Sequence, residues 1–145
     1  MALVEKSVLI EYSATQMYAL VEDVAAYPEF LPWCGGSEIL KREGEVTRAA
    51  ITIDFRGIKQ RFSTENRSYP SHLIEMNLVD GPFRQLDGSW RFKALGDDAC
   101  KIEFRLHYEF SSKLLEKIVG PVFHFIAGTF VDAFVKRARQ LYGKR

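Results

Sequence analysis

The sequence predicts an α+β fold in which a curved antiparallel sheet of about seven strands wraps around one long C-terminal helix. Three observations support this prediction. Residues 111–142 repeat apolar side chains at helical spacing. Residues 37–110 alternate apolar and polar side chains in short runs that are separated by turn residues. The length of 145 residues, with 47% apolar and 27% charged residues, suits a single domain over residues 1–145.

The N-terminal segment predicts one strand followed by two short helices. Residues 7–12 alternate between two faces, which is typical of a strand. Ser13 and Gln16 have the spacing of a capping box, which predicts a helix start. The helix directs an apolar set inward: Met17, Leu20, Val21 and Val24. Pro28 and Pro32 then break the helical pattern, so a short bent connection follows.

This connection, residues 27–36, is unusually aromatic for a loop. Phe30, Leu31 and Trp33 lie beside its prolines, where loops normally carry polar side chains. Two interpretations remain open. The segment is either a hydrophobic plug under the long helix or a gate over the mouth of an internal cavity.

The strands that follow are delimited by turn residues. Glu43-Gly44 and Arg56-Gly57 fit tight hairpin turns, and Asp80-Gly81-Pro82 turns the chain again. The last strand is the clearest, because residues 102–110 are apolar at every second position. A sheet with one apolar face needs a cover, and only the C-terminal helix is long enough to provide it.

The C-terminal helix carries a strongly aromatic stripe. Its members are Leu115, Val119, Val122, Ile126 and Phe130, with Phe123 and Phe134 on the flank. Gly120-Pro121 lies inside the helix and predicts a kink. Lys117, His124 and Asp132 interrupt the apolar run, so we do not expect a membrane span.

Three motifs and the order of elements resemble the coenzyme Q-binding, START-like family of the Bet v 1 superfamily. The motifs are Tyr27-Pro28-Glu29-Phe30-Leu31-Pro32-Trp33-Cys34, then Met76-Asn77-Leu78-Val79-Asp80-Gly81-Pro82-Phe83 with Trp90 just beyond, and Gly120-Pro121-Val122-Phe123. The resemblance covers essentially the whole chain. It implies a helix-grip fold with an internal lipid cavity and no cofactor chemistry. Mitochondrial members are associated with ubiquinone binding. Bacterial members are associated with binding the large ribosomal subunit and blocking its union with the small one, and a small ubiquitin-like protein from a neighbouring gene accompanies some of them.

No residue pattern typical of catalysis or metal binding is present. The three histidines, His72, His107 and His124, are dispersed and have no positioned partner in the sequence. Cys34 and Cys100 lack the spacing of a zinc site and are too few for a disulfide framework. We therefore expect no enzyme activity, no metal and no cofactor, and the two cysteines favour a reducing compartment.

The inward aromatic residues have a structural and a functional interpretation. Each one alone is most simply a core residue. Together, around a single kinked helix, they favour an elongated apolar cavity, where each buried methylene of an isoprenoid tail contributes roughly 0.8 kcal/mol. The predicted ligand-binding residues are Phe30, Leu31, Trp33, Phe55, Phe62, Met76, Trp90, Phe104, Tyr108, Phe123 and Phe130. Tyr108, Trp33 and Tyr27 are candidate donors to a quinone head.

Two groups of basic residues are candidates for contact with ribosomal RNA. The predicted ribosome-binding residues are Arg56, Lys59 and Arg61 around the second hairpin, and Lys136, Arg137 and Arg139 near the chain end, where Lys144 and Arg145 follow. A structural alternative is solubility and a favourable interaction with the helix dipole. Binding to phosphates would depend strongly on salt.

Two functions from different classes therefore remain open. The first is non-catalytic binding of a ubiquinone-like polyprenyl lipid in support of respiration. The alternative is a toxin that binds the large ribosomal subunit and inhibits translation initiation. The net charge of +1 gives no general attraction to polyanions, and the N-terminus resembles neither a signal nor a transit peptide, so we expect a cytoplasmic protein. A cyclase activity has no acid/base pair to support it.

Overall fold

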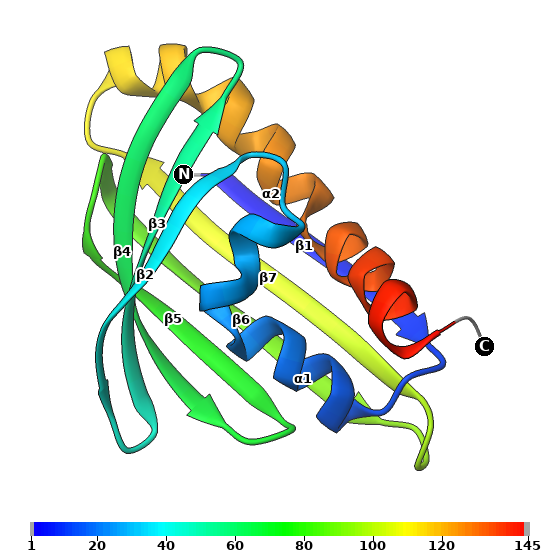
Figure 1. Ribbon diagram of the computed structural model, residues 1–145. Helices are drawn as coiled ribbons and strands as arrows, with labels where there is room; N and C mark the ends of the chain where they lie inside the picture. Colours follow the sequence, from blue (N-terminus) through cyan, green and yellow to red (C-terminus); the bar gives the residue numbers. More distant parts are fainter. Residues whose placement is uncertain (1, 144–145) are drawn as a thin grey trace.

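The computed structural model describes residues 2–143, so Lys144 and Arg145 of the predicted basic end lie outside the described residues (Figure 1). The predicted α+β class is confirmed. The elements in order are β1 (Ala2–Ile10), α1 (Ala14–Glu22), the 3-10 helix η1 (Val24–Glu29), β2 (Cys34–Glu43), β3 (Val46–Phe55), β4 (Ile58–Tyr69), β5 (Leu73–Asp80), β6 (Phe83–Ala94), β7 (Cys100–Phe110) and α2 (Lys113–Tyr142).

The seven strands form one antiparallel sheet in the order β1-β7-β6-β5-β4-β3-β2. Strands β2 to β7 follow one another as hairpins, and β1 forms the edge of the sheet by pairing with the last strand, β7. Figure 1 shows the sheet curving around α2, with α1 and η1 also on the concave side of the sheet. This is the predicted arrangement of a sheet wrapped around a long helix.

The N-terminal elements form where the local sequence predicts them. Strand β1 begins at Ala2, earlier than the predicted residue 7, because pairing with β7 continues along the whole segment. The capping box is confirmed: the Gln16 backbone amide donates to Ser13 Oγ at 3.0 Å, and the Ser13 amide donates to Gln16 Oε1 at 2.9 Å. Helix η1 contains Pro28, and its 3-10 form replaces the α-helix after Glu22.

The hairpin turn between β3 and β4 is the one that bears on the site. Arg56 and Gly57 both have positive φ angles, of 52° and 80°, as a two-residue turn that follows the sheet twist requires. Glycine adopts this conformation without strain, whereas arginine adopts it at a cost. The turn lies beside the N-terminal half of α2, and its side chains contact that helix (Figure 1).

The core lies between the sheet and α2. The alternating residues of β7 are all buried, as predicted: Ile102, Phe104, Leu106, Tyr108 and Phe110. On α2 the buried face is rotated from the predicted stripe, because Phe123 and Phe134 are buried whereas Leu115, Val122 and Phe130 are only partly covered. The sheet packs against the side that carries the flanking phenylalanines. The helix continues through Gly120 and Pro121 without interruption, and the kink stays a prediction.

Helix α2 is long and apolar enough to cross a membrane by length and composition alone. Of its most apolar stretch, 39% is buried within the protein. The core helices of globular proteins pass the same test, and the buried part of α2 packs inside the sheet. The exposed part is considered below.

Candidate functional site

An apolar cavity of about 70 Å³ lies between α2, η1 and the concave face of the sheet. Strands β3, β4 and β5 form one wall, through residues such as Ile53 and Met76. Helix α2 forms the other, through Phe123, Ile126 and Phe130. These side chains point inward because each occupies an alternating strand position or the sheet-facing side of the helix.

The structure brings together six of the predicted ligand-binding residues around this cavity. They are Trp33, Phe62, Met76, Phe104, Phe123 and Phe130. The other five, Phe30, Leu31, Phe55, Trp90 and Tyr108, do not line it. They pack instead into the surrounding core, as Trp90 does against Phe104 with ring centroids 4.5 Å apart.

The cavity is smaller than a polyprenyl lipid requires. Ligand pockets commonly measure about 300–1,000 Å³, and a cavity of about 150 Å³ binds a molecule as small as benzene. The cavity is limited to about 70 Å³ because the protein's own aromatic rings fill most of the interior. Trp33 and Phe130, for example, have ring centroids 5.6 Å apart.

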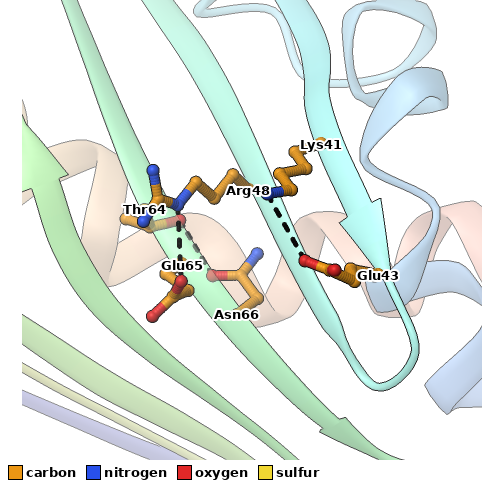
Figure 2. Close-up of polar contacts among 6 residues, drawn as sticks. All are labelled: Lys41, Glu43, Arg48, Thr64, Glu65 and Asn66. Atoms are coloured by element: carbon orange, nitrogen blue, oxygen red, sulfur yellow. Dashed lines mark hydrogen bonds and ion pairs between the residues drawn. The ribbon is translucent and has the colours of Figure 1, made fainter.

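A polar strip borders one end of the cavity, and it was not predicted from the sequence. Thr64 and Asn66 line the cavity from β4, and the Thr64 hydroxyl donates to Asn66 Oδ1 at 2.8 Å (Figure 2). Asn66 also borders an adjoining space of about 20 Å³, together with Thr47 and Ser68. The alternation of side chains along β4 could have predicted this strip, because it places Glu65 on the outer face and its neighbours Thr64 and Asn66 on the inner face. The outward side chain of Glu65 pairs with Arg48 at 3.3 Å (Figure 2).

The aromatic connection between η1 and β2 is packed as a plug in this conformation. Leu31 and Trp33 are buried, and Phe30 contacts Phe134 with ring centroids 5.2 Å apart. Tyr27 donates from its hydroxyl to the Val21 carbonyl at 2.5 Å, and burial raises the pKa of that hydroxyl. The plug interpretation fits these contacts, whereas a gating role for Phe30 and Trp33 stays a prediction.

The predicted ribosome-binding residues differ in their freedom to contact a partner. Arg61 pairs with Glu38 at 3.0 Å. Arg137 pairs with Glu29 at 3.3 Å and lies over the Phe30 ring at 5.1 Å, so it fastens α2 to the plug. Arg56 is stacked on aromatic rings of β3 and α2.

Three of the six predicted cations have neither an ion pair nor an aromatic contact within residues 2–143. These are Lys59, Lys136 and Arg139, and all three are exposed. Lys136 and Arg139 lie one turn apart near the end of α2, whereas Lys59 follows the β3–β4 turn. Helix rise places Lys136 about 16 Å along the axis from Phe125, the residue that the turn contacts. The predicted cations therefore form two separate surfaces.

A possible acid/base pair emerges only in three dimensions. The Tyr108 hydroxyl lies 3.1 Å from His124 Nδ1, across the seam between β7 and α2, and burial raises the pKa of Tyr108. The pair borders an open cleft of about 450 Å³ that also contains Glu109 and Glu116. It does not border the apolar cavity, so it cannot act on a molecule bound there.

Neither the cysteines nor the acidic side chains form a reactive centre within the described part of the chain. Cys34 and Cys100 are free and buried, and burial raises the pKa of the Cys100 thiol to about 11. Over residues 2–143, no group of three or more His, Cys, Asp or Glu side chains has the arrangement of a metal site. The cavity is lined mainly by apolar side chains.

The fold and its enclosed apolar cavity define the class of protein. Residues 10–135 match the family model described as polyketide cyclase / dehydrase and lipid transport, and the chain belongs to that family. The chain is also similar to the Zhui aromatase/cyclase from Streptomyces sp. R1128, with a TM-score of 0.84. That match covers 96% of this chain and 94% of the other at 15% identity, so it shows the fold alone.

Within the family, two curated relatives mark the functional alternatives. The chain is 46% identical over 140 residues to the ribosome association toxin RatA of Pseudomonas aeruginosa, covering 97% of both proteins. It is 32% identical over 144 residues to the mitochondrial coenzyme Q-binding protein COQ10 homolog B of Xenopus laevis. The second match covers 97% of this chain but 59% of the relative. The predicted resemblance to this group of proteins is confirmed.

Proposed function

We propose that this protein is a RatA-type toxin that associates with the large ribosomal subunit and blocks its union with the small subunit. The observation that carries the proposal is 46% identity over 97% of both chains to a protein named ribosome association toxin. The match to the coenzyme Q-binding relative is weaker, at 32% identity. The 70 Å³ cavity also favours a surface function over lipid carriage in this conformation.

Contact with ribosomal RNA requires cationic side chains that no other group of the protein holds in place. Lys136 and Arg139 meet this requirement, because they are exposed and neighbouring on one face of α2. Arg137 does not, since Glu29 and Phe30 hold it against the protein. We therefore assign the RNA contact to Lys136 and Arg139, with Lys59 as a separate second contact.

The test is co-sedimentation of purified protein with large ribosomal subunits. The variant Lys136→Glu/Arg139→Glu should lose most of the pelleted protein, and wild-type binding should weaken as salt is raised. The matched control is Arg91→Glu/Arg105→Glu, which makes the same charge change at exposed positions on β6 and β7. Retained binding of the first variant, or equal loss in the control, would reject the assigned surface. A wild-type protein that does not pellet would reject the proposed function itself.

A second candidate function is the sequestration of a hydrophobic molecule, without its chemical conversion. The observation that favours it is the apolar lining of the cavity, to which Phe62, Phe104 and Phe123 contribute. A long-chain ligand such as a ubiquinone would require these rings to move apart. Native mass spectrometry and organic extraction of the purified protein test this function, because a co-purifying polyprenyl quinone would support it and an empty protein would count against it.

Two further aspects belong to the same proposal. A cytoplasmic location is what association with ribosomes requires. A small ubiquitin-like protein as a partner rests on the family resemblance alone, and co-purification from cells that express both proteins would test it.

A further inference from the structure

Helix α2 has a second apolar stripe, which faces solvent instead of the sheet. Leu114, Ile118 and Phe125 are 66%, 51% and 46% exposed, and Pro121 between them is also exposed. These four residues follow one another at intervals of four, three and four positions. At about 100° per residue they fall on a single face of the helix. We call this set the outer stripe.

The outer stripe is distinct from the face that builds the core. The core-facing residues of the same segment are Val119 and Phe123, which are buried. Further along the helix, the line of the outer stripe continues through Asp132, Lys136 and Arg139, which are polar or charged. On this line the exposed apolar side chains are thus confined to the N-terminal half of α2, whereas Leu141, which is 52% exposed, lies on another face at the C-terminal end.

The charges around the outer stripe are predominantly positive. Lys113 and Lys117 are exposed on the helix beside it. At its far end, Phe125 stacks on Phe55 with ring centroids 6.1 Å apart, and the Arg56 guanidinium lies 4.7 Å from the Phe125 ring. Lys59 follows on the same hairpin and is exposed.

Two acidic residues close to the outer stripe in the sequence, Glu116 on α2 and Asp54 beside Phe55, point away from it, whereas Asp132 continues its line toward the C-terminus. Glu116 lies about 160° around the helix from both Leu114 and Ile118, in the cleft beside Tyr108 that Pro121 also borders. Asp54 lies against Gly35 on the neighbouring strand β2. The rim of the outer stripe is therefore complementary to a negatively charged surface with an apolar interior.

We propose that the outer stripe docks this protein on the surface of an anionic phospholipid bilayer. The three large side chains expose roughly 300 Å² of apolar surface, whereas a stable protein–protein interface needs roughly 800 Å² from each partner. A second copy of the chain is therefore a poor occupant. A bilayer surface accepts a few inserted apolar side chains and binds the neighbouring lysines and arginines through its headgroups.

Docking in this orientation brings a wall of the apolar cavity to the bilayer. Phe125 is followed directly by Ile126 and Ala127, which line the cavity. Phe125 stacks on Phe55, so the outer stripe meets the end of β3 at this point.

The experiment is flotation of the purified protein with vesicles of phosphatidylcholine alone or mixed with phosphatidylglycerol. Wild type should float with the mixed vesicles and much less with the neutral ones. The variant Leu114→Gln/Ile118→Gln should lose about tenfold or more of its partitioning, because binding scales with inserted apolar area. The matched control is Leu9→Gln/Leu40→Gln, which removes leucines that are 70% and 47% exposed on β1 and β2. Thermal melting of each variant checks the fold.

Three results would overturn the proposal. The first is a wild-type protein that does not float with anionic vesicles. The second is equal flotation of the stripe variant and the control. The third is a wild-type dimer that the stripe substitutions convert to a monomer, since the stripe would then be covered by a second copy. Loss of anionic preference in Lys113→Gln/Lys117→Gln would support the charge complementarity.

Discussion

Replacement of Phe123 by alanine should turn the small internal cavity into a binding site for benzene. Phe123 is buried, lines the cavity and contacts Tyr108 with ring centroids 4.7 Å apart. Removing its ring adds about 100 Å³, and joined to the existing 70 Å³ this gives roughly 170 Å³. A cavity of about 150 Å³ binds benzene, so the variant reaches a sufficient size whereas the wild-type cavity is about half as large.

The stability of the Phe123→Ala variant gives the first readout. Loss of a buried phenylalanine ring costs about 3–5 kcal/mol, which for a chain of this length lowers the melting temperature by about 10 °C or more. Saturating benzene should restore part of that loss, because a ligand that binds only the folded state stabilises it. Calorimetry with and without benzene measures both effects.

The matched control is Phe92→Ala. Phe92 is equally buried but does not line the cavity, so its removal leaves an isolated void of about 100 Å³, which is too small for benzene. Equal stabilisation of wild type by benzene would refute the reasoning, because the cavity would then open without any substitution. No stabilisation of Phe123→Ala would refute it as well, since the helix and sheet would have collapsed into the space.

Three further predictions follow from individual contacts. Ser13→Ala should lower the free energy of unfolding by about 1 kcal/mol in a urea titration, because it removes the hydrogen bond to the Gln16 amide, whereas Thr15→Ala, outside the capping box, should lower it less. Arg137→Met should leave ribosome co-sedimentation intact but lower the melting temperature, as it breaks the contacts with Glu29 and Phe30; loss of binding at unchanged stability would contradict this. The free energy of unfolding should fall as pH rises from about 9 to about 11. Burial raises the pKa of the Cys100 thiol to about 11, so the unfolded chain loses this proton at lower pH than the folded protein does. A Cys100→Ala variant should show a weaker decrease.

Most of the fold could be predicted because its signals are local. The alternation of β7 and the capping box at Ser13 each depend on a few neighbouring residues, and the structure confirms both. The rotation of the buried face of α2 toward Phe123 could not be predicted so well. Residues on either side of an apolar stripe are equivalent by spacing, and only the position of the sheet decides which of them is buried.

The site was harder to predict because it depends on packing between distant segments. Six cavity-lining residues were predicted, but the volume of the cavity was not. That volume is the small difference between two large ones, namely the space that helix and sheet enclose and the volume of the side chains that fill it. The contact between Tyr108 and His124 joins two elements, and so does the contact between Arg137 and Phe30. Hydropathy alone also could not tell which apolar residues of α2 face the core and which form the outer stripe, since both sets consist of the same residue types.

The main contacts of the two proposals lie at opposite ends of the same helix, and Lys59 is the residue that both use; substitutions at the two ends of the helix are therefore separable by experiment. The outer stripe ends at Phe125, and the assigned ribosome contact begins at Lys136, about 16 Å further along the helix axis. Substitutions more than about 10 Å apart with no shared partner usually act independently. Lys136→Glu/Arg139→Glu should therefore float with anionic vesicles as wild type does, and Leu114→Gln/Ile118→Gln should sediment with ribosomal subunits as wild type does. Loss of both activities in either variant would mean that the two surfaces are one, or that the substitution disturbs the fold.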